Sequence, residues 1–227
     1  MTAAAWMRQS WIGVMCAWAA CSVMGGPQRE EPLADAVRTA LSAAVAQQGP
    51  PELVHADVQS EQTFAVWLEH THTVLHQRLR SRAGSNTRSV DQALNAPLPG
   101  HELDADTLRR DFLHTVWYES QRAGLDPALV LGLIQVESGF RKFAISSAGA
   151  RGYMQVMPFW TRVLSDGDAS QLFHTQANVR FGCVILRHYL NIERGDLTLA
   201  LGRYNGSRGQ SAYPTAVLAA SKVWRPR

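Results

Sequence analysis

The chain has 227 residues, of which 46% are hydrophobic and 18% charged, so it can bury the core of one medium-sized domain. A formal charge of +3 is too small to indicate a nucleic-acid partner, although it favours contact with an anionic polymer. The sequence carries no phosphate-binding loop, nucleotide fingerprint or convincing metal motif. We therefore expect no cofactor, no metal and no nucleic-acid partner.

Residues 1–26 have the pattern of an export signal. Arg8 is the only charged residue before Arg29, and "WIGVMCAWAA" is an apolar run too short to span a bilayer. Two processing sites fit this segment. Cleavage after "AWA" at 17–19 would release a soluble protein, whereas "AWAAC" would place an outer-membrane lipid anchor on Cys21. Both alternatives predict an exported protein of the periplasm.

The next region, residues 27–99, is predicted to be helical and to end in a linker. Helices are expected over 33–47 and over 61–80, and the polar stretch 82–100 is rich in helix breakers. His72 and His76 are four residues apart, but no third metal ligand accompanies them, so we expect them to pack or to face solvent.

Residues 100–227 are predicted to form a second helical unit. A helix is expected from about 104 to 124, followed by one that Asp126 and Pro127 begin and Gly139 ends. This second helix is apolar nearly all round, which predicts a buried central helix. Further helices fit 176–193, 197–203 and 212–223, and Cys183 lies in an apolar run that predicts a buried, inert thiol. No run alternates long enough to form a sheet, so the predicted fold class is all-α.

The stretch from 136 to 158, "VESGFRKFAISSAGARGYMQVMP", contains one carboxylate, Glu137. It lies in the last turn of the apolar helix, where burial and the helix dipole both raise the pKa of a carboxyl group. A carboxylic acid that stays protonated near neutrality can act as a general acid. The alternative is an ordinary helix-end glutamate that reaches solvent or pairs with Arg141.

The residues after Glu137 suit a ligand site. "SSAGARG" is a loop of small residues that permits close approach of a ligand to the backbone. Gln155 offers an amide for a sugar hydroxyl or N-acetyl group, and Tyr153 and Met154 offer apolar surface for a sugar ring. A plain surface loop, with Met154 and Met157 in the core, is the alternative.

Three motifs in this order resemble those of the family 1 lytic transglycosylases, whose catalytic domain has a goose-type lysozyme-like fold. The first is carried by Glu137 and Ser138, with Phe140 after them. The second is carried by Ser146, Gly149, Ala150, Gly152, Met154, Gln155, Met157 and Pro158, and the third by Ala200, Tyr204 and Asn205. A weaker motif is present at Asn178 and Gly182. Tyr153 replaces a common Leu, "YNGSRG" departs from the common pattern, and residues 27–100 have no counterpart.

The resemblance implies a peptidoglycan lytic transglycosylase that acts on the bond between N-acetylmuramic acid and N-acetylglucosamine. Glu137 would serve as acid and then as base, so that the muramoyl 6-hydroxyl closes a 1,6-anhydro ring without water. Tyr204 would orient Glu137, and Asn205 would fix the loop around Tyr204. The substrate-binding residues would be Ser146, Tyr153, Met154, Gln155, Met157 and Asn205. Because all the motifs lie after residue 104, residues 100–227 would form the catalytic unit, and residues 27–99 would be dispensable for the chemistry.

Two other functions remain open at this point. A goose-type lysozyme would hydrolyse the bond and would need a second carboxylate, for which Asp166 and Asp168 are the nearest downstream acids, although they fit turn positions better. A non-catalytic wall-binding module is the second alternative. The biological task is either wall turnover or work with a cell-wall or secretion machinery.

Overall fold

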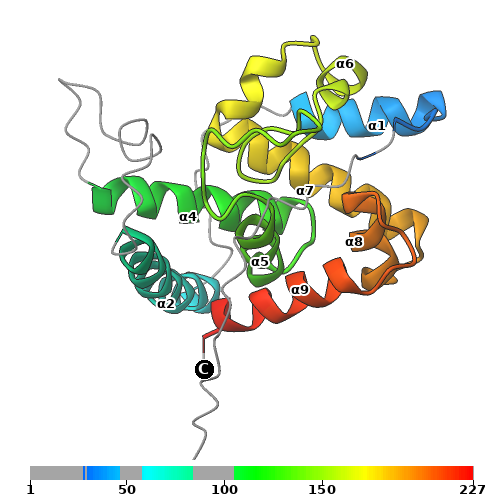
Figure 1. The fold of residues 1–227 in the computed structure, drawn as a ribbon. Helices are drawn as coiled ribbons and strands as arrows, with labels where there is room; N and C mark the ends of the chain where they lie inside the picture. The colour runs from blue at the N-terminus through cyan, green and yellow to red at the C-terminus, as the bar shows by residue number, and fades with distance from the viewer. Residues whose placement is uncertain (1–27, 29, 47–57, 84–104, 227) are drawn as a thin grey trace, which may run out of the picture.

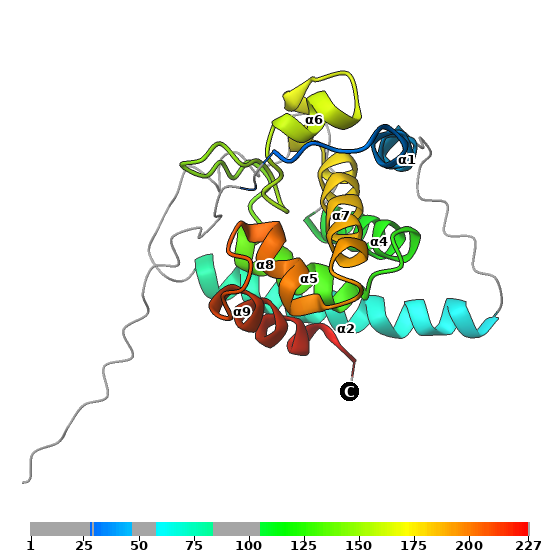
Figure 2. The ribbon, with the colours of Figure 1, turned by 90° about the vertical axis from the view of Figure 1, so that its right-hand side faces the viewer.

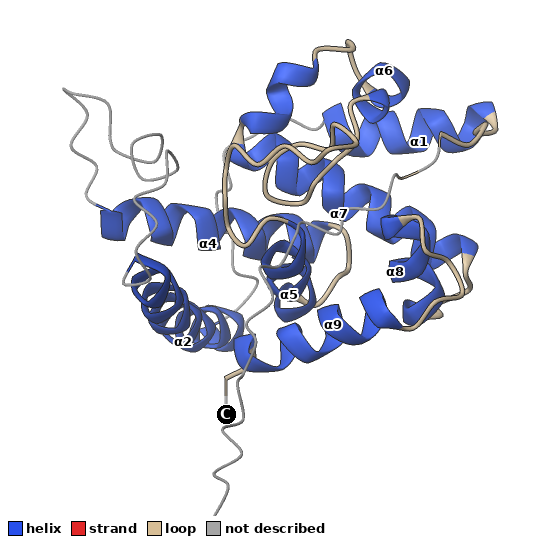
Figure 3. Cartoon of the chain, viewed as in Figure 1, coloured by secondary structure: helices blue, strands red, loops and turns tan. Residues whose placement is uncertain are grey.

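The computed structural model describes residues 28, 30–46, 58–83 and 105–226, and within these ranges every named element is a helix (Figures 1 and 3). In chain order the elements are α1 (Asp35–Ala46), α2 (Val58–Ala83), α4 (Ala105–Arg122), α5 (Pro127–Glu137), α6 (Phe159–Leu164), η1 (Ala169–Phe173), α7 (Thr175–Ile192), α8 (Leu197–Asn205), α9 (Ala212–Ser221) and η2 (Lys222–Trp224). Extended pairing in the described part is limited to isolated bridges of Arg151 with Ile145 and Val156. The predicted all-α class is confirmed.

Helix α5 is the buried central helix that the sequence predicts. The Asp126 carboxylate accepts a hydrogen bond from the Ala128 N–H at 2.8 Å, Pro127 opens the first turn, and Gly139 follows the end with a φ of 58°. Helices α4, α7, α8 and α9 surround α5 in Figure 1. Helix α9 comes so close that a Cβ on Gly132 would lie 2.7 Å from the Ser221 nitrogen, which explains a glycine inside this helix.

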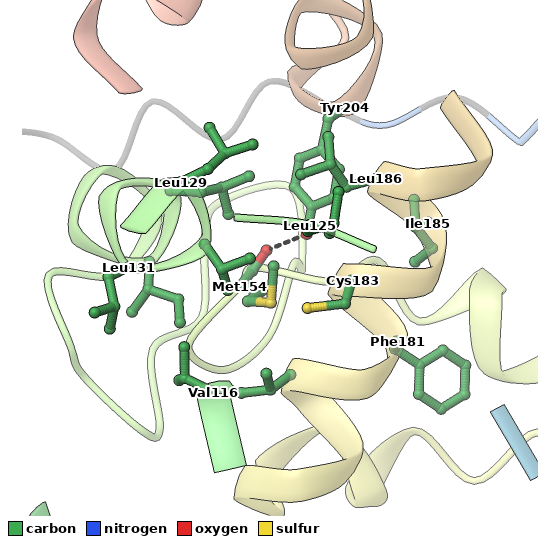
Figure 4. Packing of buried hydrophobic residues seen from close by; sticks show 14 of the residues in the cluster. Val116, Leu125, Leu129, Leu131, Met154, Phe181, Cys183, Ile185, Leu186 and Tyr204 are labelled. Carbon is green, nitrogen blue, oxygen red and sulfur yellow. Dashed lines mark hydrogen bonds between the residues drawn. The ribbon is translucent and has the colours of Figure 1, made fainter. Parts of the chain in front are cut away.

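The core lies between α5, α4 and α7. Its fully buried side chains include Leu131, Ile134, Val116 and Ile185, and Figure 4 shows part of this cluster around Met154. Cys183 lies within it at 1% exposure, and burial raises the pKa of its thiol, so the prediction of a buried, inert cysteine is confirmed.

Helices α1 and α2 both pack on the helices that follow them in the chain. Helix α2 lies against α4 and η2, whereas α1 lies against α6 and α7 (Figures 1 and 2). On α2, Phe64 and Trp67 meet Trp117 of α4, with ring centroids 5.3 and 4.9 Å apart. His72 contacts Asp106 of α4 at 2.8 Å, so this histidine has a packing role.

The predicted signal segment 1–26 and the predicted boundary at residue 100 lie outside the described residues. The sequence prediction missed α6 and η1, which are 6 and 5 residues long and too short for a helical period to appear. Among the described helices, none combines the length and hydropathy needed to cross a membrane.

Candidate active site

Glu137 is the last residue of α5 and is 3% exposed. The hydroxyl of Tyr213, from α9, donates a hydrogen bond to its Oε1. Burial raises the pKa of Glu137 to about 8, against the opposing effect of the Tyr213 bond. The alternative of a solvated helix-end glutamate is therefore wrong, and Arg141 instead donates to the Ser138 carbonyl at 2.9 Å. At neutral pH this carboxyl is mostly protonated, as a general acid requires.

Tyr213 is the functional candidate that sequence reasoning missed. It is 8% exposed, and burial, followed by the nearby Glu137, raises its pKa well above the usual range, so it keeps its proton and acts as a donor. The sequence signal was weak, because Tyr213 is 76 residues from Glu137 and stands in an ordinary predicted helix. Only the packing of α9 against α5 brings the two together.

Ser146 closes the loop of small residues that follows Glu137. Its backbone N–H donates to the Ala150 carbonyl at 3.0 Å, and its hydroxyl accepts from the Ala150 N–H at 3.1 Å. Gly149, with a φ of 87°, makes the turn between them. The Ser146 oxygen is thus held in place by the backbone, while its O–H can still donate to a ligand.

Gln155 is held in a constrained position at 2% exposure. Its φ is 50°, an uncommon conformation for a residue other than glycine. Its Nε2 donates to the carbonyls of Gly152 and Ala144 at 2.9 and 3.2 Å, whereas its buried Oε1 has no hydrogen-bond partner in the described protein. A buried acceptor without a partner is costly unless a ligand supplies the donor.

The other predicted binding residues are placed at different depths. Met154 is 0% exposed in the core, and its N–H donates to Asn178 Oδ1 at 2.8 Å. Tyr153 and Met157 are partly buried, and the Tyr153 ring lies 4.7 Å from the ring of Phe112. Met154 therefore supports the loop from beneath, and of these three only Tyr153 and Met157 keep exposed area.

The hydroxyl of Tyr204 is bonded to the loop after Glu137 and not to the Glu137 carboxyl group, which the sequence predicted it to orient. Its hydroxyl donates to the Met154 carbonyl at 2.8 Å, the bond drawn in Figure 4. Burial, followed by the nearby Glu137, raises the pKa of Tyr204 well above its usual range. The hydroxyl that contacts the Glu137 carboxyl group is that of Tyr213. Asn205, the next residue, is 6% exposed. The hydroxyl of Tyr204 thus contacts the loop that carries Gln155, and its predicted role in orienting Glu137 stays a prediction.

Asp166 and Asp168 are both used in a surface turn. Asp166 accepts from the N–H of Asp168 at 3.0 Å, and Asp168 accepts from the N–H of Ser170 at 2.8 Å and caps η1. These bonds to Ser170 hold the pKa of Asp168 below its usual value. The interpretation as turn residues is confirmed. Among the described residues, no group of three or more His, Cys, Asp or Glu side chains could hold a metal ion.

Comparison with known proteins finds similar sequences over this part of the chain. Residues 115–216 match the model of the transglycosylase SLT domain. A membrane-bound lytic murein transglycosylase C from Mannheimia succiniciproducens is 40% identical over 85 residues, which are 37% of this chain and 23% of that protein. The protein of the same name from Actinobacillus pleuropneumoniae serotype 5b is 31% identical over 121 residues, which are 50% of this chain and 32% of that protein.

The chain thus spans about a third or less of the length of these relatives. A solved structure of an inactive mutant of lytic transglycosylase Slt from Pseudomonas aeruginosa aligns with a TM-score of 0.45 and 22% identity, over 54% of this chain and 26% of that one. The segment matched by the family model contains Glu137, the loop up to Pro158, Tyr204 and Tyr213. The similarity to the transglycosylase SLT domain thus extends over the part of the chain that holds the candidate active site.

Proposed function

We propose that the chain is a peptidoglycan lytic transglycosylase. It would cleave the β-1,4 bond between N-acetylmuramic acid and N-acetylglucosamine and leave a 1,6-anhydro-N-acetylmuramic acid end. The observation that carries this proposal is the burial of Glu137 within an SLT domain, which makes it a general acid at neutral pH. The predicted catalytic unit 100–227 contains every residue that the mechanism uses.

The chemistry needs one carboxyl group that changes its protonation state twice. Because Oε1 of Glu137 accepts from Tyr213, the carboxyl proton belongs on Oε2, which would deliver it to the glycosidic oxygen as that bond breaks. The N-acetyl group of the muramoyl residue would stabilise the developing cation. The ionised Glu137 would then take the proton of the muramoyl 6-hydroxyl as its oxygen bonds to the anomeric carbon. The acid is regenerated and no water is consumed.

The loop after Glu137 would hold the sugar. Gln155 Oε1 is an acceptor suited to an N–H or O–H of the substrate, and the Ser146 hydroxyl is available as a donor. Tyr153 and Met157 would contribute apolar contacts to a pyranose face. These assignments follow from the type of each group and from its place beside the acid in the chain.

Hydrolysis by a lysozyme-type mechanism is the alternative, and it is disfavoured by the use of Asp166 and Asp168 in a surface turn. Inverting and retaining glycosidases need a second carboxylate close to the acid. Digestion of purified sacculi followed by mass spectrometry separates the two cases. Anhydro-muropeptides, lighter than hydrolysis products by one water, support the proposal, whereas reducing-end muramic acid as the main product contradicts it.

We also propose that the protein is exported and acts in the periplasm on peptidoglycan strands. The leader pattern at 1–26 and the relatives named as membrane-bound murein transglycosylases support this location. A substitution at Cys21 distinguishes a lipid-anchored protein from a soluble one. Changing Cys21→Ala should release a lipoprotein from the membrane fraction and should leave the distribution of a soluble enzyme unchanged. Cell fractionation of the full chain beside a control that lacks residues 1–26 tests export. Association with cell-wall or secretion machinery is a separate proposal.

A further inference from the structure

Four side chains form a row that runs from the loop between α5 and α6 to η1 (Figure 1). The ring centroids of Phe143 and Phe173 lie 5.9 Å apart. Lys142 Nζ lies 5.4 Å from the Phe143 centroid, and Arg151 Cζ lies 5.6 Å from the Phe173 centroid. Two neighbouring rings are thus each paired with a cation, and these four side chains are called the cation–aromatic row below.

The apolar part of this row is open to solvent. Phe143 is 42% exposed, and Ile145, two residues further on, is 62% exposed, whereas Ala144 between them is buried. Among the exposed large hydrophobic side chains of the described residues, Phe143 is the only aromatic one. Exposed apolar side chains that gather beside charged groups are typical of a contact surface.

The backbone connects this surface directly to the loop that would hold the sugar. The Ala144 carbonyl, which lies between Phe143 and Ile145, accepts a hydrogen bond from Gln155 Nε2 at 3.2 Å. Ser146, whose hydroxyl is the proposed donor to the sugar, directly follows Ile145. The row is therefore fixed beside the groups proposed to bind the glycan.

The two cations of the row can still bind an anion. Arg151 donates to the Ala169 carbonyl through Nη1 at 3.0 Å, which leaves other N–H groups of its guanidinium. Within the described ranges, no acidic side chain forms an ion pair with Lys142 or Arg151. Asp168 is an acid at the Arg151 end, and its pKa is lowered chiefly by its bonds to Ser170 and less by cations that include Arg151. Its carboxylate accepts from the N–H and the hydroxyl of Ser170, both at 2.8 Å.

We propose that the cation–aromatic row, together with Ile145, is a subsite for the peptide stems that N-acetylmuramic acid carries. These stems have free carboxylates and methyl side chains. Lys142 and Arg151 would pair with the carboxylates, while Phe143 and Ile145 would cover the methyl groups. The proposal rests on the proposed transglycosylase function and adds the part of the substrate that is recognised besides the sugars.

The test compares peptidoglycan strands that carry stems with the same strands after an amidase has removed them. In the full chain, Lys142→Gln and Phe143→Ser should each lower kcat/KM about fivefold on the peptide-bearing strands, mainly through KM, because each removes one contact made outside the reacting bond. On the stripped strands both variants should stay within about twofold of wild type, since the contact that they lack has no partner there.

Lys222→Gln and Ile192→Ser are the matched controls, because Lys222 is an exposed cation of η2 and Ile192 is a 43% exposed residue of α7. Both should match wild type on both substrates. An unchanged rate for either row variant on the peptide-bearing strands, or an equal loss on both substrates, overturns the proposal. A wild-type chain that forms no anhydro product from either substrate would instead refute the proposed function itself.

Discussion

Two glutamates of this protein are buried to the same degree but in opposite surroundings. Glu119, on α4, is 2% exposed, and its Oε1 accepts from Arg180 Nε and Nη2 at 3.0 and 2.8 Å, while Arg122 lies 3.4 Å from its Oε2. Glu137, at the end of α5, is 3% exposed and meets the neutral hydroxyl of Tyr213. The first carboxylate has its charge compensated by two guanidinium groups, whereas the second has a partner without charge.

The contrast shows that burial alone does not identify a catalytic acid. A buried carboxylate between two arginines is a structural ion pair, which links α4 to α7 and is costly to break. A buried carboxyl without a countercharge favours its protonated form and destabilises the fold once it is forced to ionise. The cost in stability that a buried Glu137 carries fits the catalytic role proposed for it. The following substitutions test this division of roles.

The largest effect is expected for Glu137→Gln. Glutamine keeps the shape and can still accept from Tyr213, but it can neither protonate the leaving oxygen nor take a proton from the 6-hydroxyl. General acid–base catalysis contributes about 10²- to 10⁴-fold, and in the proposed mechanism this residue would act in both steps, so the rate should fall by that range or more. Release of muropeptides from sacculi measures the loss, and circular dichroism checks the fold. Residual activity above a few per cent of wild type would show that Glu137 is not the catalytic acid.

The same substitution at the other site, Glu119→Gln, should show the opposite profile. It leaves Arg180 as a buried charge without its carboxylate, and breaking such a pair typically destabilises by about 3–5 kcal/mol. Denaturant unfolding should therefore show a large loss of stability, while the folded fraction turns over substrate at close to the wild-type rate. A stable but inactive Glu119→Gln variant would contradict the structural role.

The stability of Glu137→Gln should depend on pH relative to wild type. The pKa of Glu137 is about 8 in the folded protein and about 4.5 in the unfolded chain, so the folded state binds the extra proton between these values. The stabilising effect of this bound proton is fully present below pH 4.5 and is lost as the pH rises through 8. Glu137→Gln should therefore gain on wild type as the pH rises, by a few kcal/mol at pH 9. Melting temperatures at pH 5 and pH 9 measure this, and an equal difference at both would refute the raised pKa.

A smaller effect is expected for Tyr213→Phe, which removes the one hydrogen bond that lowers the pKa of Glu137. The pKa should rise further, so the alkaline limb of kcat/KM should move to higher pH. The rate at neutral pH should fall by about tenfold, because the carboxyl loses the bond that fixes its orientation, worth about 1–1.5 kcal/mol. Tyr204→Phe is the informative comparison, because it should lower the rate without moving that limb as far.

The sequence predicted the parts of this site that local signals specify. The bounds of α5 followed from Asp126, Pro127 and Gly139, and the pKa shift of Glu137 followed from the apolar helix around it. The contacts of Tyr213 with Glu137 and of Gln28 with Trp160 could not be predicted, since they join residues 76 and 132 positions apart. Nothing local distinguishes Tyr213 from other helical tyrosines, and only the packing of whole helices brings these side chains together.

The smallest effect is expected for Asp166→Asn and Asp168→Asn, and it bears most directly on the lysozyme alternative. Both carboxylates are exposed and accept hydrogen bonds from backbone N–H groups of their own turn, so neither is positioned to activate a water molecule. Loss of the Asp168 cap should cost no more than about 0.5–2 kcal/mol of stability, and neither change should alter the rate by more than about twofold. Rates on sacculi at matched protein concentration provide the measurement.

If either substitution reduces activity as strongly as Glu137→Gln, a second carboxylate takes part and the single-acid mechanism fails. If both leave the rate intact while Glu137→Gln abolishes it, the turn at 166–168 has no catalytic role, and the substrate's own N-acetyl and 6-hydroxyl groups remain as the partners of the acid.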